Sequence, residues 1–414
     1  MPLPRVIPAL ADLTQDIAGP LPVTLLHAWA AGAQDVETAR ALLQAFRIEG
    51  SVVATDTSGL SRMVEGRDLL DVLALISAPK SIIHAVGVAA GGVGVGIWVA
   101  DNSEMFYPAH VPPGAVLDAA GETQARITES CEVSVGMAVH YGQFYNIGGG
   151  LYGRDADTVE LLAENDARAG EVLVTTAMAN RVAGGADARF TPAPELRARD
   201  GSMVFRFATS ARATGLAVTA DVRYPHPFPE EFFSQLTALA TAPDREASKQ
   251  AIYEQYLRER VIVFLSVERE PSDGGLPTLL DDLVVNALVE TVIGRLPGAA
   301  AHVTGISGGI AILSFAQADE ALDLAITLRA HFMQNAMMVK VGIDRGPVLF
   351  SANTRGRSGI TGDPVNVASK ISEDAGAVGR INITARAAAT MPRLPDSQPF
   401  QTTISGITLR GVFI

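Results

Sequence analysis

Short apolar runs rich in β-branched residues alternate along the chain with longer amphipathic stretches, which is the pattern of strands separated by helices. Apolar strands are expected at Ser51–Asp56 and Gly170–Thr175 in the first half, and at Val261–Ser266 and Gly379–Thr384 in the second. The amphipathic stretches predict helices near Arg67–Ile76, Ala115–Ser130, Asp157–Ala167, Leu279–Ile293, Asp319–Gln334 and Val365–Glu373.

The order of these elements repeats once along the chain. Offsets of 206 to 210 residues relate the apolar strands, the segments YGRDADTVELLAEN and SGITGDPVNVASKI, and the closing strands SMVF and RGVF. A period of this length indicates two copies of one domain, because solenoid repeats are roughly 20–50 residues long. The alignment sets Glu160 opposite Asn366, Glu164 opposite Lys370, Ser202 opposite Arg410, Ser266 opposite Asp56 and Gly309 opposite Asp101.

Four segments follow from this repeat. We expect an N-terminal helical segment over residues 1–48 and a first domain over 49–208, then a linker with a helical segment over 209–258 and a second domain over 259–414. Strands that alternate with amphipathic helices in this order indicate an α+β fold of the split β-α-β kind.

Two long stretches without charge, Ser81–Ala100 and Gly298–Ala318, raise the question of a membrane span. Both contain several glycines and end in β-branched runs, which is more typical of buried strands than of spanning helices. We therefore expect no membrane span.

Charge and cysteine content narrow the functional class. The 414 residues include 32 Lys and Arg against 45 Asp and Glu, for a net charge of −13. Such a chain gains nothing from counterion release on a phosphate backbone, so nucleic-acid binding is disfavoured. Cys131 is the single cysteine, which excludes an internal disulfide framework and fits a cytoplasmic protein.

Several familiar catalytic and ligand-binding motifs are incomplete or absent in the sequence. The sequence GISGG at 305–309 matches a hydrolase nucleophile elbow, yet the one histidine that follows it is His331, in a predicted helix. No phosphate-binding loop of the Walker type is present, and the seven histidines are too scattered for a metal site. His84 and His302 lie in apolar surroundings that are typical of core positions.

Asp56 and Asp101 are the stronger candidates for chemistry. Asp56 ends an apolar strand, and Asp101 lies at the tip of an expected hairpin. Two carboxylates at neighbouring strand ends can hold hard divalent cations of the kind that phosphoryl transfer requires. Aspartate is also favoured in turns without any function, so both interpretations stay open at this point.

Three motifs in order resemble the catalytic domains of class III adenylate and guanylate cyclases. These are DTSGLS from Asp56, ADN around Asp101, and GDPVNVASK from Gly362 to Lys370. The resemblance implies two ferredoxin-like (βαββαβ) domains, packed as an intramolecular pseudo-heterodimer with a site between them. Because the halves would satisfy each other's interface, further oligomerisation is not required, and a protein partner stays open.

The resemblance also implies a division of labour. Asp56 and Asp101 of the first half would bind Mg²⁺ or Mn²⁺. Asn366 would orient the ribose of ATP or GTP, Lys370 stands where the family has a catalytic arginine, and Arg410 would be the cation for the terminal phosphates. Gly305 and Gly359 fall where the family reads the base, so the side chains do not distinguish ATP from GTP. The opposite combination, with Ser266 and Gly309 facing Glu160 and Glu164, would be inactive.

Three functions remain compatible with the sequence. The chain is a cyclase with one composite site, or an inactive pseudo-cyclase that binds a nucleotide or another ligand as a regulator, or an interaction module that reuses the fold. Complementary residues on opposite halves favour the first, whereas Lys370 and the two glycines favour the second.

Overall fold

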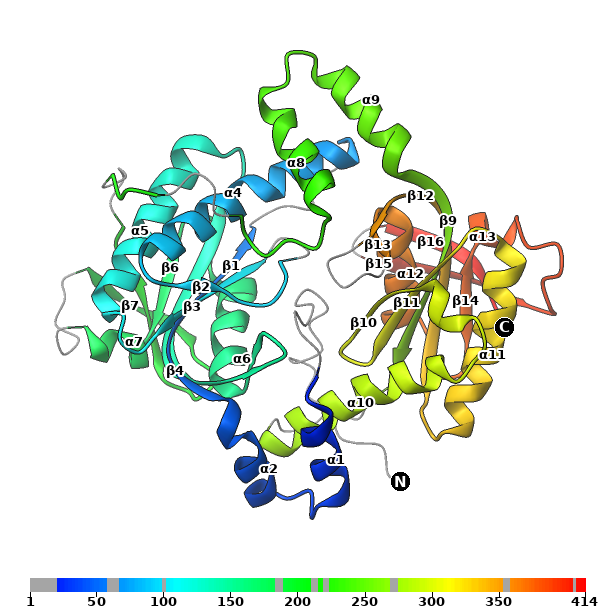
Figure 1. Cartoon of the computed structure of the whole chain (residues 1–414), viewed down its shortest axis with the longest axis horizontal. Helices are drawn as coiled ribbons and strands as arrows, with labels where there is room; N and C mark the ends of the chain where they lie inside the picture. Colours follow the sequence, from blue (N-terminus) through cyan, green and yellow to red (C-terminus); the bar gives the residue numbers. More distant parts are fainter. Residues whose placement is uncertain are drawn as a thin grey trace. The chain divides into compact units, whose positions relative to one another are not determined.

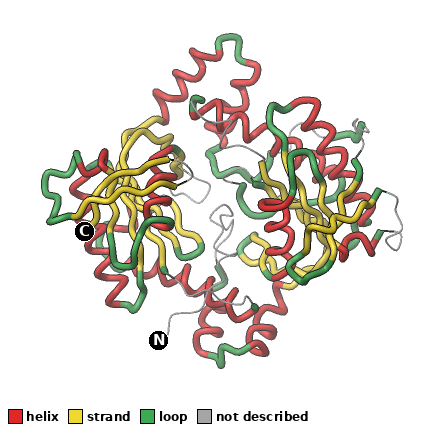
Figure 2. The backbone as a smooth tube through the Cα atoms, turned by 180° about the vertical axis from the view of Figure 1, so that it is seen from behind, coloured by secondary structure: helices red, strands yellow, loops and turns green. Residues whose placement is uncertain are grey.

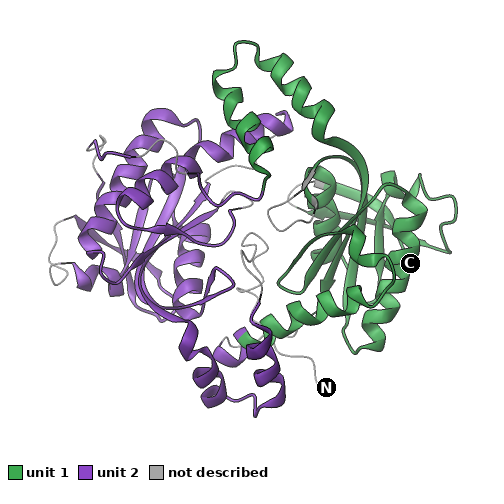
Figure 3. Ribbon diagram, in the orientation of Figure 1, with its two compact units in different colours: residues 1–11, 228–273, 280–414 green, residues 12–227, 274–279 purple. Residues whose placement is uncertain are grey.

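The computed structural model describes residues 21–57, 67–98, 102–182, 189–209, 215–218, 223–268, 275–352, 358–404 and 407–414. The chain divides into two compact units (Figure 3). Unit 2 contains residues 12–227 and 274–279, and unit 1 contains residues 1–11, 228–273 and 280–414. Each unit is built around one large sheet (Figure 2).

Unit 2 holds an eight-stranded sheet in the order β2-β3-β1-β4-β6-β8-β7, with β5 paired to β4. The first four strands of this order, with a helix after β1 and another after β3, form a ferredoxin-like βαββαβ core (Figure 1). The elements are α1 (Val23–Ala31), α2 (Val36–Leu43), β1 (Arg47–Thr57), α4 (Leu69–Ala89), β2 (Val93–Gly94), β3 (Ser103–Pro108), α5 (Pro113–Ser130), β4 (Val135–Ile147), β5 (Gly150–Tyr152), α6 (Arg154–Leu161), β6 (Val172–Thr175), α7 (Thr176–Arg181), β7 (Phe190–Arg197) and β8 (Met203–Phe207).

Unit 1 repeats this sheet strand for strand, in the order β10-β11-β9-β12-β14-β16-β15 with β13 paired to β12. The predicted α+β fold in two copies is therefore confirmed. The elements are α8 (Glu230–Ala238), α9 (Arg245–Tyr256), β9 (Leu257–Val267), α10 (Leu276–Gly294), β10 (Val303–Ser307), β11 (Ile310–Phe315), α11 (Ala318–Gln334), β12 (Val339–Ala352), β13 (Ser358–Thr361), α12 (Asp363–Glu373), β14 (Ile381–Thr384), α13 (Ala385–Ala388), β15 (Gln398–Ile404) and β16 (Ile407–Phe413).

Strand register fixes which residues of the two units correspond. Val53 of β1 pairs with Val139 of β4, which pairs with Val174 of β6. In unit 1 the same chain of pairs runs from Val263 through Ile343 to Ile383. Counting from these anchors, Ser266 holds the position of Asp56, as the sequence predicts.

The two faces of each sheet carry different helices. In unit 1, alternate residues of β9 (Val261, Val263 and Leu265) pack with α10 and α11 in one apolar core. The opposite face carries α12, where Asn382 Nδ2 of β14 donates to the Ile371 carbonyl oxygen at 2.9 Å. In unit 2, Val52 and Ala54 of β1 belong to the core that includes α6 residues. The α6 and α12 faces therefore correspond.

The first uncharged stretch is a helix followed by a short strand. From Ser81 to Ala89 it lies in α4, and of the described part of its β-branched end, β2 covers Val93–Gly94. Gly298–Ala318, in contrast, contains β10 and β11 as expected. Among the described residues, α4 is the one helix long and apolar enough to cross a membrane, and 56% of its apolar window is buried within the fold.

Candidate functional site

The first candidate ligand, Asp56, lies one residue before the end of β1, opposite Gly136 of β4, and is half-buried. Strand alternation places its side chain on the same face as Val52 and Ala54, which is the face covered by α6. A carboxylate in this place suits a hard divalent cation. Asp101, its expected companion, lies outside the described residues.

The matching position of unit 1 has no carboxylate. Ser266 is 8% exposed, and its hydroxyl lies 3.2 Å from that of Ser372 on α12. A neutral hydroxyl that is already engaged with a helix is a poor ligand for magnesium compared with a carboxylate. Unit 1 therefore has a serine where unit 2 has the first candidate ligand, as the sequence alignment set them.

Asn366 and Lys370 lie one turn apart on the exposed side of α12. The other side of this helix is anchored by Pro364, Ala368 and Ile371. Lys370 Nζ lies 3.3 Å from Asp374 Oδ2, and both side chains are about half exposed, at 52% and 44%. An ion pair this exposed contributes roughly 0–1 kcal/mol, so the ammonium can exchange its partner for a phosphate at little cost.

The two helices α6 and α12 begin in the same way. Gly153 and Gly362 precede them with φ values of 108° and 151°, which favour glycine. After this glycine, Asp155 approaches Gly142 of β4 just as Pro364 approaches Gly346 of β12. The residue of unit 2 that corresponds to Asn366 is therefore Asp157.

This correspondence corrects the sequence alignment. Glu160 was expected opposite Asn366 and Glu164 opposite Lys370, but the shared helix start sets Asp157 and Leu161 there. The sequence alignment was wrong because it followed the few identical residues of the two segments and not the positions that are buried on each helix. Val159 and Leu162 on α6 are buried where Ala368 and Ile371 are buried on α12.

Asp157 is closed off within its own unit. Its carboxylate is 2% exposed and forms an ion pair with Arg199, which follows β7 in the turn toward β8. Burial raises the pKa of Asp157 to about 6, and the Arg199 guanidinium works against that rise. Sequence analysis missed Arg199, since nothing in the composition of the turn RARDG marks a partner for α6.

Gly305 and Gly359 lie on neighbouring strands of unit 1. Gly305 is on β10, next to an irregularity in its pairing with β11, and Gly359 is on β13. The two strands contact each other. Among the described residues, a Cβ atom at Gly305 would meet only Ile312 Cδ1, at 3.9 Å, so this position has room for part of a ligand. Glycine itself offers no side-chain donor.

Arg410 is not brought together with Asn366 and Lys370. It lies on β16 two residues before Val412, which pairs with Ile383 and packs against the α10 and α11 core. Alternation along β16 therefore directs Arg410 to that face and away from α12. Strand register also identifies the counterpart of Arg410 in unit 2. Val204 pairs with Thr175, just as Gly411 pairs with Thr384, so Met203 holds the position of Arg410. The expected match with Ser202 is therefore wrong by one residue.

No protein-family model and no curated protein matches the chain. A class III adenylyl cyclase-like ATP-binding protein from Pseudomonas aeruginosa is 13% identical, with a TM-score of 0.45 over 84% of this chain and 85% of that one. The chain is similar to class III cyclase structures.

Two further solved cyclase structures show the same likeness over part of the chain. The adenylyl cyclase CyaB from Pseudomonas aeruginosa is 16% identical, with a TM-score of 0.33 over 41% of this chain and 98% of that one. The guanylate cyclase domain of RhGC from Catenaria anguillulae, in complex with GTP, is 14% identical, with a TM-score of 0.30 over 37% and 94%. The likeness concerns the fold, and the chemistry rests on the residues described above.

Proposed function

We propose that the chain is a class III cyclase-like protein with one composite nucleotide site, which converts a purine nucleoside triphosphate to the 3′,5′-cyclic monophosphate and pyrophosphate. Asp56 and Asp101 of the first domain would supply the metal ligands. Asn366 and Lys370 of the second domain would face the nucleotide. The two domains would pair as a pseudo-heterodimer within the chain.

The observation that carries this proposal is a reciprocal loss at matched positions. Where unit 2 has Asp56, unit 1 has Ser266 bonded to Ser372. Where unit 1 has the exposed Asn366, unit 2 has Asp157, buried and paired with Arg199. The side chains that would bind metal and those that would face the nucleotide therefore occur in different units, which supports a site that combines Asp56 of one domain with Asn366 and Lys370 of the other.

The proposed chemistry is attack of the ribose 3′-oxygen on the α-phosphorus, with loss of the 3′-hydroxyl proton and departure of pyrophosphate. Bound Mg²⁺ or Mn²⁺ would lower the pKa of that hydroxyl and neutralise phosphate charge. Asn366 would hold the ribose by hydrogen bonds, and Lys370 would neutralise charge on the α-phosphoryl oxygens. Because lysine is a point charge without the fork of arginine, we expect modest turnover.

The base pocket is defined by backbone and glycine. With Gly305 and Gly359 at the two base-reading positions, the purine would be recognised by its shape and by main-chain groups. We therefore expect little discrimination between ATP and GTP, since strong discrimination needs a side chain that one base leaves unpaired.

The test is incubation of the purified chain with ATP or GTP and Mg²⁺ or Mn²⁺, followed by measurement of cyclic nucleotide and pyrophosphate. Asp56→Asn should reduce the rate by at least about 100-fold, because it removes a metal ligand while keeping the size of the side chain. Ser266→Ala, at the matched position of unit 1, should leave the rate within about twofold of wild type. Equal loss in both variants would contradict the assignment of the metal to the first domain.

The second candidate function is a pseudo-cyclase that binds nucleotide without turning it over. Lys370 in place of arginine and the two glycines favour it. Metal-dependent nucleotide binding without product, for either base and either metal, would establish this reading and exclude the enzyme. Absence of any nucleotide binding would leave the interaction module.

A further inference from the structure

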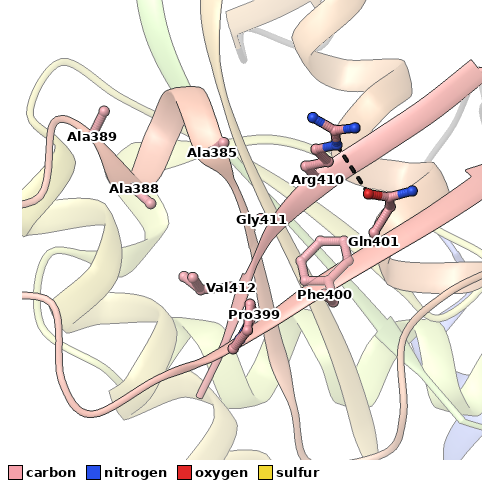
Figure 4. A pocket seen from close by; sticks show the side chains of 9 residues that line it. All are labelled: Ala385, Ala388, Ala389, Pro399, Phe400, Gln401, Arg410, Gly411 and Val412. Atoms are coloured by element: carbon pink, nitrogen blue, oxygen red, sulfur yellow. Dashed lines mark hydrogen bonds between the residues drawn. The ribbon is translucent and has the colours of Figure 1, made fainter.

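A hollow on the surface of unit 1 lies outside the proposed nucleotide site. Its volume is about 640 Å³, within the range of small-molecule sites, and it opens to solvent between α13 and the β15–β16 hairpin (Figure 4). Because Arg410 and Val412 face the α10 and α11 side of the sheet, the hollow is on the opposite face from α12.

The lining of this hollow is apolar except at one end. Figure 4 shows Arg410 and Gln401 at that end and the alanines of α13 at the other. Pro399 pairs with Val412 and shares the face of Arg410, whereas the Phe400 ring lies beside Gly411 on the opposite face. The apolar side chains that could cover a ring or a short alkyl chain are Ala385, Ala388, Ala389, Pro399 and Val412.

The polar end presents only donors. Arg410 Nε donates to Gln401 Oε1 at 3.0 Å, which fixes the amide so that its NH₂ group is left to donate. Among the described residues, no carboxylate lies within ion-pair distance of Arg410. Its guanidinium donates to Gln401, and no other described residue accepts a hydrogen bond from it. Both side chains are exposed enough for a ligand to reach them.

We propose that this hollow is an accessory binding site for a small organic monocarboxylate with an aromatic or alkyl body. A planar carboxylate matches the forked donors of arginine and would receive a further bond from the Gln401 amide. A free phosphate fits poorly, because a single guanidinium over an apolar floor leaves most of its oxygens without donors. The apolar body would lie over Pro399, Val412 and the alanines of α13.

Unit 2 provides a natural comparison. Register puts Met203 at the position of Arg410, so the corresponding place on β8 has no cation. The carboxylate site therefore belongs to unit 1 alone, like the exposed Asn366, although it lies on the other face of the sheet.

The test is ligand-observed NMR titration of the full chain with 1-naphthoate and with the neutral 1-naphthamide. We expect naphthoate to bind at least about tenfold more tightly than naphthamide, and Arg410→Met to reduce naphthoate affinity to the naphthamide level. Ala389→Trp, which fills the hollow from an exposed position, should weaken both. Arg295→Met, which removes another exposed guanidinium of unit 1, should change neither.

Three results would overturn the site: naphthoate affinity unchanged in Arg410→Met, naphthoate affinity unchanged in Ala389→Trp, or competition by millimolar inorganic phosphate. Thermal unfolding of each variant checks that the fold is kept. Naphthoate binding that persists in Asp56→Asn shows that the site is independent of the proposed cyclase chemistry, whereas its loss in that variant would assign the probe to the nucleotide site and overturn the proposal.

Discussion

At the scale of single residues, the Asp157–Arg199 pair makes stability depend on pH. Burial raises the pKa of Asp157 from 3.8 to about 6, which corresponds to roughly 3 kcal/mol. Since the folded chain holds this proton more tightly than the unfolded chain, the stabilisation is complete below about pH 4 and is lost as the pH rises through 6. Asp157→Asn should remove this loss, so its melting temperature relative to wild type should rise between pH 4 and 7.

The control for this prediction is Asp118→Asn. Asp118 is paired with Arg189 at 2.8 Å, but its side chain is 65% exposed. Solvent screens such a pair, so this variant should follow wild type across the same pH range. A parallel pH profile for Asp157→Asn and wild type would show that Asp157 is ionised without cost in the folded chain.

The residues that sequence analysis could predict are those fixed by strand alternation. Asp56 and Ser266 were matched correctly because an error of one residue in a strand would turn a buried position outward. Asn366 was matched wrongly with Glu160 and Arg410 with Ser202, because helix starts and edge hairpins tolerate shifts in the alignment. The pairing of Asp157 with Arg199 joins α6 to a distant turn, and no local pattern records it.

At the scale of elements, the segment that follows the first sheet is held on α4 by Tyr224. The Tyr224 ring stacks on Trp98 with centroids 5.6 Å apart, and its hydroxyl lies 2.9 Å from that of Ser77 on α4. Lys80 Nζ, 2% exposed, donates to the Trp98 carbonyl oxygen at 3.0 Å, and Trp98 N–H donates to the Pro225 carbonyl oxygen at 2.7 Å. This part of the expected linker is therefore part of the fold of unit 2.

Two variants separate the ring from its hydroxyl. Tyr224→Phe should cost about 1 kcal/mol of unfolding free energy, because it removes the hydrogen bond between the hydroxyls of Tyr224 and Ser77. Tyr224→Ala should cost roughly 3–5 kcal/mol, because it also removes a ring that is 3% exposed. Urea unfolding followed by Trp98 fluorescence in a Trp29→Phe background measures both. Equal effects of the two variants would mean that the stack on Trp98 contributes nothing.

The elements that were predicted well are those with one buried face. Helix α11, for example, buries one side and exposes the other, and it begins and ends within one residue of its prediction. The helix α4 was underestimated because it is apolar along most of its length and contains Pro79 and Gly87. Local propensity argued against a helix there, and packing against α5 and the sheet decided the outcome.

At the scale of the whole molecule, the chain contains one sheet architecture twice, with different side chains at matched positions. The two sheets have the same strand order at all eight strands, so the fold accommodates Ser266 at the position of Asp56 and Asp157 at the position of Asn366 without rearrangement. The sequence could predict this duplication because the order of elements survives even where side chains do not. The sequence could not predict the contacts at the two positions that differ, which are Ser266 with Ser372 in unit 1 and Asp157 with Arg199 in unit 2.

The reciprocal loss predicts the number of nucleotides that one chain binds. With a closed position at Asp157 and no carboxylate at Ser266, we expect equilibrium dialysis with a non-hydrolysable triphosphate and Mn²⁺ to give one nucleotide per chain. Asn366→Ala should weaken that binding by about tenfold through the loss of ribose hydrogen bonds, whereas Asp157→Asn should not change the number bound. Two nucleotides per chain would mean that both combinations of domains bind, and the two domains would then be equivalent partners despite their different side chains.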